Sequence, residues 1–109
     1  MRYEVHQIHL SHAQYDQMNA GELQGIRNAL LEAKVHENVV PALKALLYKH
    51  VATIEAEDLE DVFEVGNIGP EHQIERYAPM HSVSVGDIIR DPEGRTFVVA
   101  GIGFTQLGG

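Results

Sequence analysis

The first ten residues show the alternation of apolar side chains that is typical of a β-strand. Tyr3 and Val5 fall on one side of an extended chain, whereas Ile8 and Leu10 fall on the other. Because successive side chains of a strand point to opposite faces, this pattern predicts a strand with both faces covered.

Two helices are predicted next. Ser11 is a good N-cap, and Gln14 three residues later fits a capping box, so a short helix is expected over residues 12–19. A break at Ala20 and Gly21 separates it from a second helix, whose apolar positions recur at three- and four-residue steps. That stripe consists of Leu23, Ile26, Leu30 and Ala33.

A third helix is predicted to start near Asn38, another favourable N-cap, with Pro41 in the first turn. Its apolar stripe consists of Val40, Leu43, Leu47 and Val51. Two adjacent amphipathic helices joined by a short link favour a helical hairpin, and each is too short to be stable without a shared core. A short strand is expected over residues 51–54.

Residues 55–64 have the pattern of a short helix with an acidic side and an apolar side. At about 100° per residue, the acidic side carries Glu57, Asp58, Glu60, Asp61 and Glu64. The apolar side carries Leu59, Val62 and Phe63. Residues 66–70, which contain Gly66, Gly69 and Pro70, predict the end of this helix.

The last third of the chain has the pattern of a β-hairpin. Val83 and Val85 alternate with serines, and residues 91–94 fit a type I turn that leads into a partner strand over residues 95–100. The predicted elements together favour an α+β fold, in which the N-terminal helices pack on a small, mainly antiparallel β-sheet with this C-terminal β-hairpin. The N-terminal strand is expected to join the sheet as an edge strand or as a partner.

The predicted core comprises Leu23, Ile26, Leu30, Leu43, Leu47, Phe63, Val85, Ile88, Phe97, Val99 and Phe104. At 109 residues, the chain is expected to form one domain over residues 1–109. Residues 1–58 supply a strand and the helical part, and residues 59–107 supply the remainder.

The composition argues against several classes of protein. Eight Lys and Arg stand against sixteen Asp and Glu, and a formal net charge of −8 disfavours direct binding of nucleic-acid backbones. The lack of cysteine excludes disulfides, thiolate metal sites and cysteine nucleophiles, and it fits a reducing compartment. No apolar run is long enough for a membrane span, and no signal peptide is apparent. We therefore expect a cytoplasmic protein that does not bind membranes.

The negative charge is concentrated in one stretch. Residues 51–75 contain eight acidic residues and no Lys or Arg, which equals the net charge of the whole chain. The simplest interpretation is a solvated helix face followed by an acidic loop. A functional interpretation is a docking surface for a basic protein partner, made by Glu57, Asp58, Glu60, Asp61 and Glu64. A third interpretation, binding of a divalent cation, is disfavoured because the order of the acidic residues does not match an EF-hand loop.

Seven histidines are many for a chain of this length. His6, His9 and His12 suggest a metal cluster, but no regular element gathers them, because on a strand His6 and His12 lie about 20 Å apart. A zinc site would need another histidine to be brought in by folding, from among His36, His50, His72 and His81. We therefore assign no metal ligand and no cofactor from the sequence.

No catalytic motif is apparent, so no catalytic residue is assigned and an enzyme is not expected. The three serines lie outside any nucleophile elbow, and no phosphate-binding or dinucleotide-binding glycine motif is present. Asp87 is a candidate carboxylate, although an Asp that follows a Gly at a corner between strands commonly caps backbone N–H groups.

Three segments of the C-terminal half carry a resemblance to a known family. They are Leu-Glu-Asp-Val-Phe-Glu at residues 59–64 with Asn67, Ser-Val-Ser-Val-Gly-Asp-Ile-Ile at residues 82–89, and Phe-Val-Val at residues 97–99 with Gly103, Phe104 and Leu107. Residues 59–107 thus resemble the YodL-like domain of plasmid, phage and other mobile-element proteins. The resemblance implies a bacterial cytosol and a role in interfering with or adapting host machinery, and it implies no particular reaction.

The leading hypothesis is a small acidic cytosolic protein of a phage or plasmid. It would bind a host or element-encoded protein with a basic surface and modulate or inhibit host machinery for defence or nucleic-acid processing. One alternative is a metal-binding or small enzyme module that uses histidines and Asp87. Another is a homodimeric structural protein, whose seam is supplied by Val39, Leu46 and Leu47 of the helical hairpin.

Overall fold

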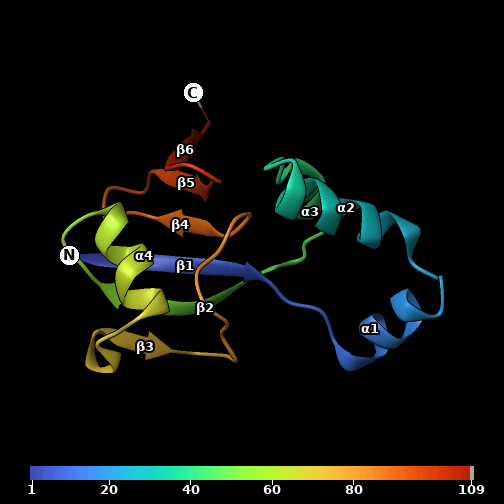
Figure 1. Ribbon diagram of the computed structural model, residues 1–109, viewed down its shortest axis with the longest axis horizontal. Helices are drawn as coiled ribbons and strands as arrows, with labels where there is room; N and C mark the ends of the chain where they lie inside the picture. Colours follow the sequence, from blue (N-terminus) through green and yellow to red (C-terminus); the bar gives the residue numbers. More distant parts are fainter. Residues whose placement is uncertain (109) are drawn as a thin grey trace.

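A computed structural model, which describes residues 1–108, confirms the α+β prediction. Within these residues, six strands form one sheet in the order β3-β2-β1-β4-β5-β6, and every neighbouring pair is antiparallel (Figure 1). The strands are β1 (Arg2–Ile8), β2 (Tyr48–Glu55), β3 (Ile74–Arg76), β4 (Ile88–Arg90), β5 (Thr96–Val99) and β6 (Phe104–Leu107). The helices are α1 (His12–Asn19), α2 (Gln24–Val35), α3 (Val40–Lys44) and α4 (Leu59–Asn67), and a 3₁₀ turn, η1, spans Glu71–Gln73.

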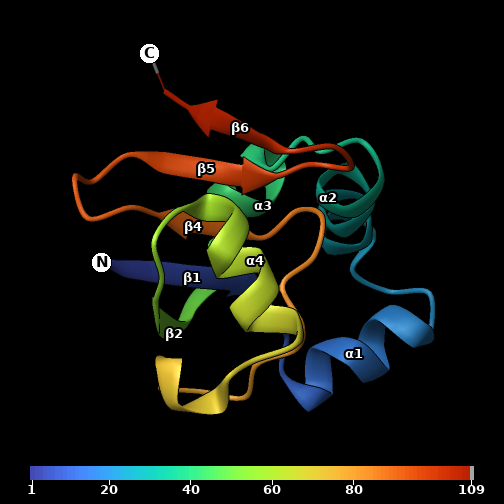
Figure 2. The ribbon, with the colours of Figure 1, turned by 60° about the vertical axis from the view of Figure 1, so that its left-hand side comes forward.

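The N-terminal strand is a central partner in the sheet, because β1 lies between β2 and β4. Its two faces contribute to separate core clusters. On one face, Tyr3 and Val5 belong to a cluster that includes Val62 of α4, whereas Ile8 on the other face belongs to a cluster that includes Ala33 of α2. Figure 2 shows α4 in front of β1, with α3 behind β4 and β5. The predicted strand with two covered faces is confirmed.

The first helix has the predicted bounds and the predicted cap. The hydroxyl of Ser11 accepts the Gln14 N–H at 3.1 Å, and the Gln14 side-chain oxygen accepts the Ser11 N–H at 2.8 Å. In α2, by contrast, the buried residues are Ala29 and Ala33, whereas Ile26 and Leu30 are half-buried and Leu31 and Val35 are exposed. Small side chains therefore form the face of α2 that packs most closely.

The third predicted helix is wrong beyond its first turns. α3 ends at Lys44, the backbone of Leu46 is left-handed with φ 57°, and β2 begins at Tyr48. The apolar spacing of residues 40–51 fits a helix, but pairing with β1 along its whole length makes residues 48–55 a strand. The strand expected over residues 51–54 is therefore longer than predicted.

The C-terminal hairpin is confirmed, with β4 and β5 as its strands. Asp91 Oδ1 accepts the N–H groups of Glu93 at 3.0 Å and Arg95 at 2.8 Å, which fixes the turn between them. Val83 and Val85 lie before β4 in a loop and not in a strand. Their segment instead passes beside α4, where Val83 is buried.

The predicted core is only partly correct. Buried members are Leu47, Ile88 and Val99; half-buried members are Leu23, Ile26, Leu30, Val85, Phe97 and Phe104; exposed members are Leu43 and Phe63. The three residues expected to form a dimer seam do not form a surface, because Val39 and Leu47 are buried inside the protomer and only Leu46 is exposed. In the part of the chain that the structure describes, no helix is both long and apolar enough to cross a bilayer.

Candidate functional site

The acidic segment forms α4, but the helix begins and ends later than predicted. Asp58 is the N-cap, and its Oδ1 accepts the Asp61 N–H at 2.8 Å. Asp61 Oδ2 in turn accepts the Glu57 N–H at 3.0 Å, and the helix continues through Gly66 to Asn67. Two of the five expected docking carboxylates therefore cap the helix, where the positive end of the helix dipole also favours them.

Cationic groups from elsewhere in the fold pair with three further acids of residues 51–75. The pairs are Glu55 with the Met1 amine at 2.6 Å, Glu75 with Arg2 at 2.8 Å, and Glu71 with Arg76. The guanidinium of Arg2 holds the pKa of Glu75 below its usual range, and Arg76 does the same for Glu71. The acidic excess of this stretch is therefore smaller in the folded protein than the sequence indicates.

The remaining acids of the segment are Glu57, Glu60 and Glu64, which we call the acidic rim. All three are exposed, and among residues 1–108 none of them forms an ion pair. Glu60 and Glu64 are four residues apart on α4, so they lie on the same side of the helix. The exposed negative surface of α4 is thus narrower than the predicted five residues.

An apolar groove lies directly beside the acidic rim. It encloses about 260 Å³ between α4 and the strands β5 and β6, and its lining includes Glu60, Phe63, Val99, Ala100 and Phe104. The adjoining loop carries Ile102, which is 98 % exposed. An apolar floor next to unpaired carboxylates has the anatomy of a protein-binding surface, in which an apolar centre is bordered by charged groups.

Phe63 belongs to this groove and not to the core. Its side chain is 42 % exposed, because Val62 and Val65 form the buried side of α4. The groove has no signature in the sequence, since its walls come from segments far apart in the chain. The exposed placement of Ile102 between two glycines is the one local signal that points to this region.

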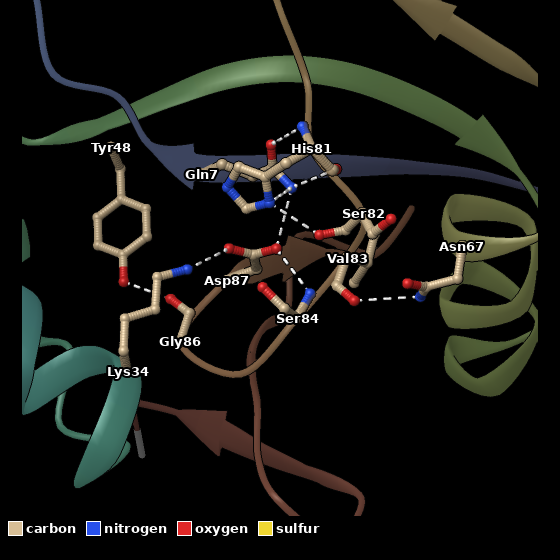
Figure 3. A network of polar contacts seen from close by, with 10 residues as sticks. All are labelled: Gln7, Lys34, Tyr48, Asn67, His81, Ser82, Val83, Ser84, Gly86 and Asp87. Carbon is tan, nitrogen blue, oxygen red and sulfur yellow. Dashed lines mark hydrogen bonds and ion pairs between the residues drawn. The ribbon is translucent and has the colours of Figure 1, made fainter.

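A second polar cluster surrounds Asp87, which is fully buried (Figure 3). Asp87 Oδ2 accepts the Ser84 N–H at 2.9 Å and the Gln7 side-chain amide at 3.0 Å, while Oδ1 lies 3.4 Å from Lys34 Nζ. Burial raises the pKa of Asp87, and the Lys34 ammonium opposes that shift. The contact with Ser84 confirms the turn-capping interpretation of this residue.

Two further hydrogen bonds hold the loop that carries Asp87 against the neighbouring elements. The hydroxyl of Tyr48 donates to the Gly86 carbonyl, and the side chain of Asn67 donates to the Val83 carbonyl at 3.1 Å. Burial raises the pKa of Tyr48. No buried side-chain nitrogen or oxygen in the described residues lacks a hydrogen-bond partner. Figure 3 shows how these contacts connect α2, α4 and β1 to the loop of residues 81–87.

The histidines do not form the cluster that residues 6, 9 and 12 suggest. His9 is exposed after the end of β1, and His12 is exposed at the start of α1. Folding instead places His50 of β2 beside His6, with Glu4 completing a group whose candidate ligand atoms lie within 4.8 Å of one another. Burial lowers the pKa of His6, and its contact with Glu4 opposes that shift. Among the described residues, this group could hold a metal ion.

Comparisons with known proteins supply no relative from which a role could be transferred. No family model, no curated protein and no solved structure matches the chain. The function is therefore inferred from the acidic rim, the groove beside it and the polar clusters of this structure.

Proposed function

We propose that this chain is a protein-binding module that docks a partner with a basic surface on α4. The single observation that carries the proposal is the exposure, without an ion pair, of Glu60, which lines the apolar groove that contains Phe63 and Phe104, with Glu64 exposed one helical turn further along α4. Free carboxylates speed association with a positively charged partner and orient it. The groove can then bury an apolar side chain of the partner, and this burial supplies the affinity.

The acids of residues 51–75 have different roles in this proposal. Those that pair with Met1, Arg2 and Arg76 attract a basic partner weakly, because a cation already lies beside each carboxylate. Among the described residues Asp58 and Asp61 form no ion pair, but their main contribution is to the start of α4. The acidic rim therefore replaces the larger acidic face as the proposed docking surface.

The setting of this activity is also a proposal, which rests on the resemblance to the YodL-like domain. It would be the bacterial cytosol, where a phage or plasmid protein modulates or inhibits host machinery for defence or nucleic-acid processing. Several residues that carry the resemblance, including Asn67, Ser84 and Asp87, hold α4 and the adjoining loop in place. A shared motif at these positions would preserve the frame on which the acidic rim is presented.

The proposal can be tested by capture of partners from a bacterial lysate on the immobilised chain. The double variant Glu60→Gln with Glu64→Gln removes two rim charges, and the matched control Asp16→Asn with Glu22→Gln removes two exposed charges elsewhere. Both double variants change the formal net charge from −8 to −6. A second comparison sets Phe63→Ala, in the groove, against Tyr15→Ala, which alters an aromatic residue of similar exposure on α1.

We expect a captured protein to be lost from the rim variant and from Phe63→Ala, while both controls retain it. Binding should also weaken as salt is raised above 0.1 M, since the Debye length falls from about 10 Å at that concentration to about 3 Å at 1 M. If no protein distinguishes the variants from their controls, the docking surface on α4 is wrong.

A further inference from the structure

The side chains of Glu4, His6 and His50, here called the His–Glu cluster, meet on the face of the sheet opposite α4. Glu4 and His6 are two residues apart on β1, so they point to the same face, and His50 is the cross-strand partner of His6 on β2. Glu4 Oε1 lies 3.0 Å from His6 Nε2. The candidate ligand atoms of the three residues are all within 4.8 Å of one another.

A bulge in the strand pairing creates this arrangement. Val5 pairs with Ala52, but His6 pairs with His50, so Val51 is an extra residue on β2. In an uninterrupted register, His6 would lie opposite Val51 and no second imidazole would be at hand. β-Bulges are frequent next to functional sites because they redirect a side chain. Here the bulge brings together two histidines that no local pattern in the sequence connects.

Two imidazoles and one carboxylate are a donor set that zinc favours. Sites with two His and one Glu leave a fourth position for water or another ligand. We propose that Glu4, His6 and His50 form a binding site for Zn²⁺, with its fourth position directed towards the hollow beside His6. This proposal is independent of the docking surface, which lies on the other face of the sheet. It does not involve Asp87, whose oxygens are engaged by Ser84, Gln7 and Lys34.

A neighbouring hydroxyl group orients the imidazole ring of His50. Thr53 Oγ1 lies 3.3 Å from His50 Nε2 and accepts the hydroxyl of Tyr77 at 3.0 Å. Partners of this kind fix the orientation of metal-binding histidines in known sites. The rings of His6 and His50 are stacked, with centroids 4.8 Å apart and planes at 21°. Because ring nitrogens bind metals in the plane of the ring, one ring must turn about χ2, a torsion with a broad energy minimum.

The hollow beside His6 gives the proposed metal an open side. It encloses about 170 Å³ between the sheet and α3, and its lining includes His6, Leu43, Tyr48 and Arg90. That volume holds several water molecules, since each occupies about 30 Å³ in the liquid. The positive charge of Arg90, the cross-strand partner of Glu4, opposes cation binding, but Arg90 is exposed and water screens its charge. The carboxylate of Glu4 offsets part of the charge of the ion.

The test uses the full chain without a histidine tag, freed of metal by a chelator and then dialysed. Isothermal titration with ZnCl₂ measures stoichiometry and affinity, and Co²⁺ in place of Zn²⁺ reports coordination through its visible absorption. We expect one Zn²⁺ per chain and a tetrahedral Co²⁺ spectrum. The variants His6→Gln, His50→Gln and Glu4→Gln should each lower the affinity by about tenfold or more.

The matched controls are His9→Gln and His72→Gln, which remove exposed histidines outside the His–Glu cluster. Both should bind Zn²⁺ as the wild type does. The proposal is overturned if the wild type binds no stoichiometric Zn²⁺, or if a control variant loses binding while His50→Gln retains it. Should a cluster variant fail to fold, NMR of the wild type decides: Zn²⁺ must shift the ring nitrogens of both His6 and His50.

Discussion

Gly66 of α4 allows the helix to approach the loop of residues 82–85 more closely than any other residue would. A Cβ atom at Gly66 would lie 2.4 Å from Cγ2 and 3.2 Å from Cβ of Val83, whose side chain is buried. Valine is stiff at χ1, so relief of this overlap requires movement of the helix or the loop. Gly66→Ala should therefore combine a helix-propensity gain of about 1 kcal/mol with an overpacking cost of about 1–3 kcal/mol.

Gly25 of α2 provides a matched control, because a Cβ atom there would meet no atom within 4 Å. Gly25→Ala should raise the free energy of unfolding by up to about 1 kcal/mol, since Gly25 lies in the first turn of α2. Because the propensity gain is common to both variants, Gly66→Ala should be the less stable of the two by about 1–3 kcal/mol. In a domain of this size, each kcal/mol corresponds to about 4 °C in Tm.

Urea denaturation followed by far-UV circular dichroism measures both changes. A double-mutant cycle with Val83→Ala isolates the overlap, since the smaller residue at position 83 should recover most of the loss. Equal stabilisation by Gly66→Ala and Gly25→Ala would refute the close contact between α4 and this loop. The position of the acidic rim relative to the groove would then have to be revised.

Two other predictions concern charged residues. Lys34→Met removes the cation beside buried Asp87, so the pKa of Asp87 in the folded state should rise further above its unfolded value. A carboxyl group whose pKa is raised in the folded state stabilises the fold below its unfolded pKa, and this stabilisation is lost as the pH rises. In urea titrations, the destabilisation by Lys34→Met should therefore be larger at pH 8 than at pH 4.5. A loss of stability that does not depend on pH would contradict this reasoning. Asp58→Ala should reduce the free energy of unfolding by about 1 kcal/mol through loss of the N-cap. Glu60→Gln should change the free energy of unfolding by less than about 0.5 kcal/mol. Equal effects of the two substitutions would show that these acids do not differ in role.

Elements whose contacts lie within a few residues were predictable from the sequence. Ser11 and Gln14 cap α1 through atoms three residues apart, and Asp91 closes its hairpin turn through Glu93 and Arg95. Such contacts depend on side-chain chemistry and local backbone geometry, both of which the sequence specifies.

Elements that depend on distant pairing were not predictable in this way. Residues 40–51 have helical spacing and good helix formers, yet Leu46 turns the chain and β2 pairs with β1 instead. Helix propensity is a weak preference that tertiary contacts override. The same limit explains why Leu43 is exposed at α3 and not part of the core.

In the candidate site, too, local features are visible in the sequence and features that depend on distant pairing are not. The concentration of acids in residues 51–75 is visible in the sequence, and Asp58 with Asp61 three residues later was a local capping signal that the charge pattern obscured. Pairing of Glu75 with Arg2 depends on the order of strands in the sheet. The groove at Phe63 and the approach of His50 to His6 likewise depend on strand order and register.

The central place of β1 governs the order in which the chain can acquire its structure during synthesis. One edge of β1 pairs with β2, but the other edge pairs with β4, which is translated long after β1 and β2. Pairings between such distant segments form slowly, and an uncovered edge is a template for aggregation. A nascent chain that lacks residues 88–90 therefore exposes the middle of its own sheet, and completion of the fold must follow translation of the C-terminal hairpin.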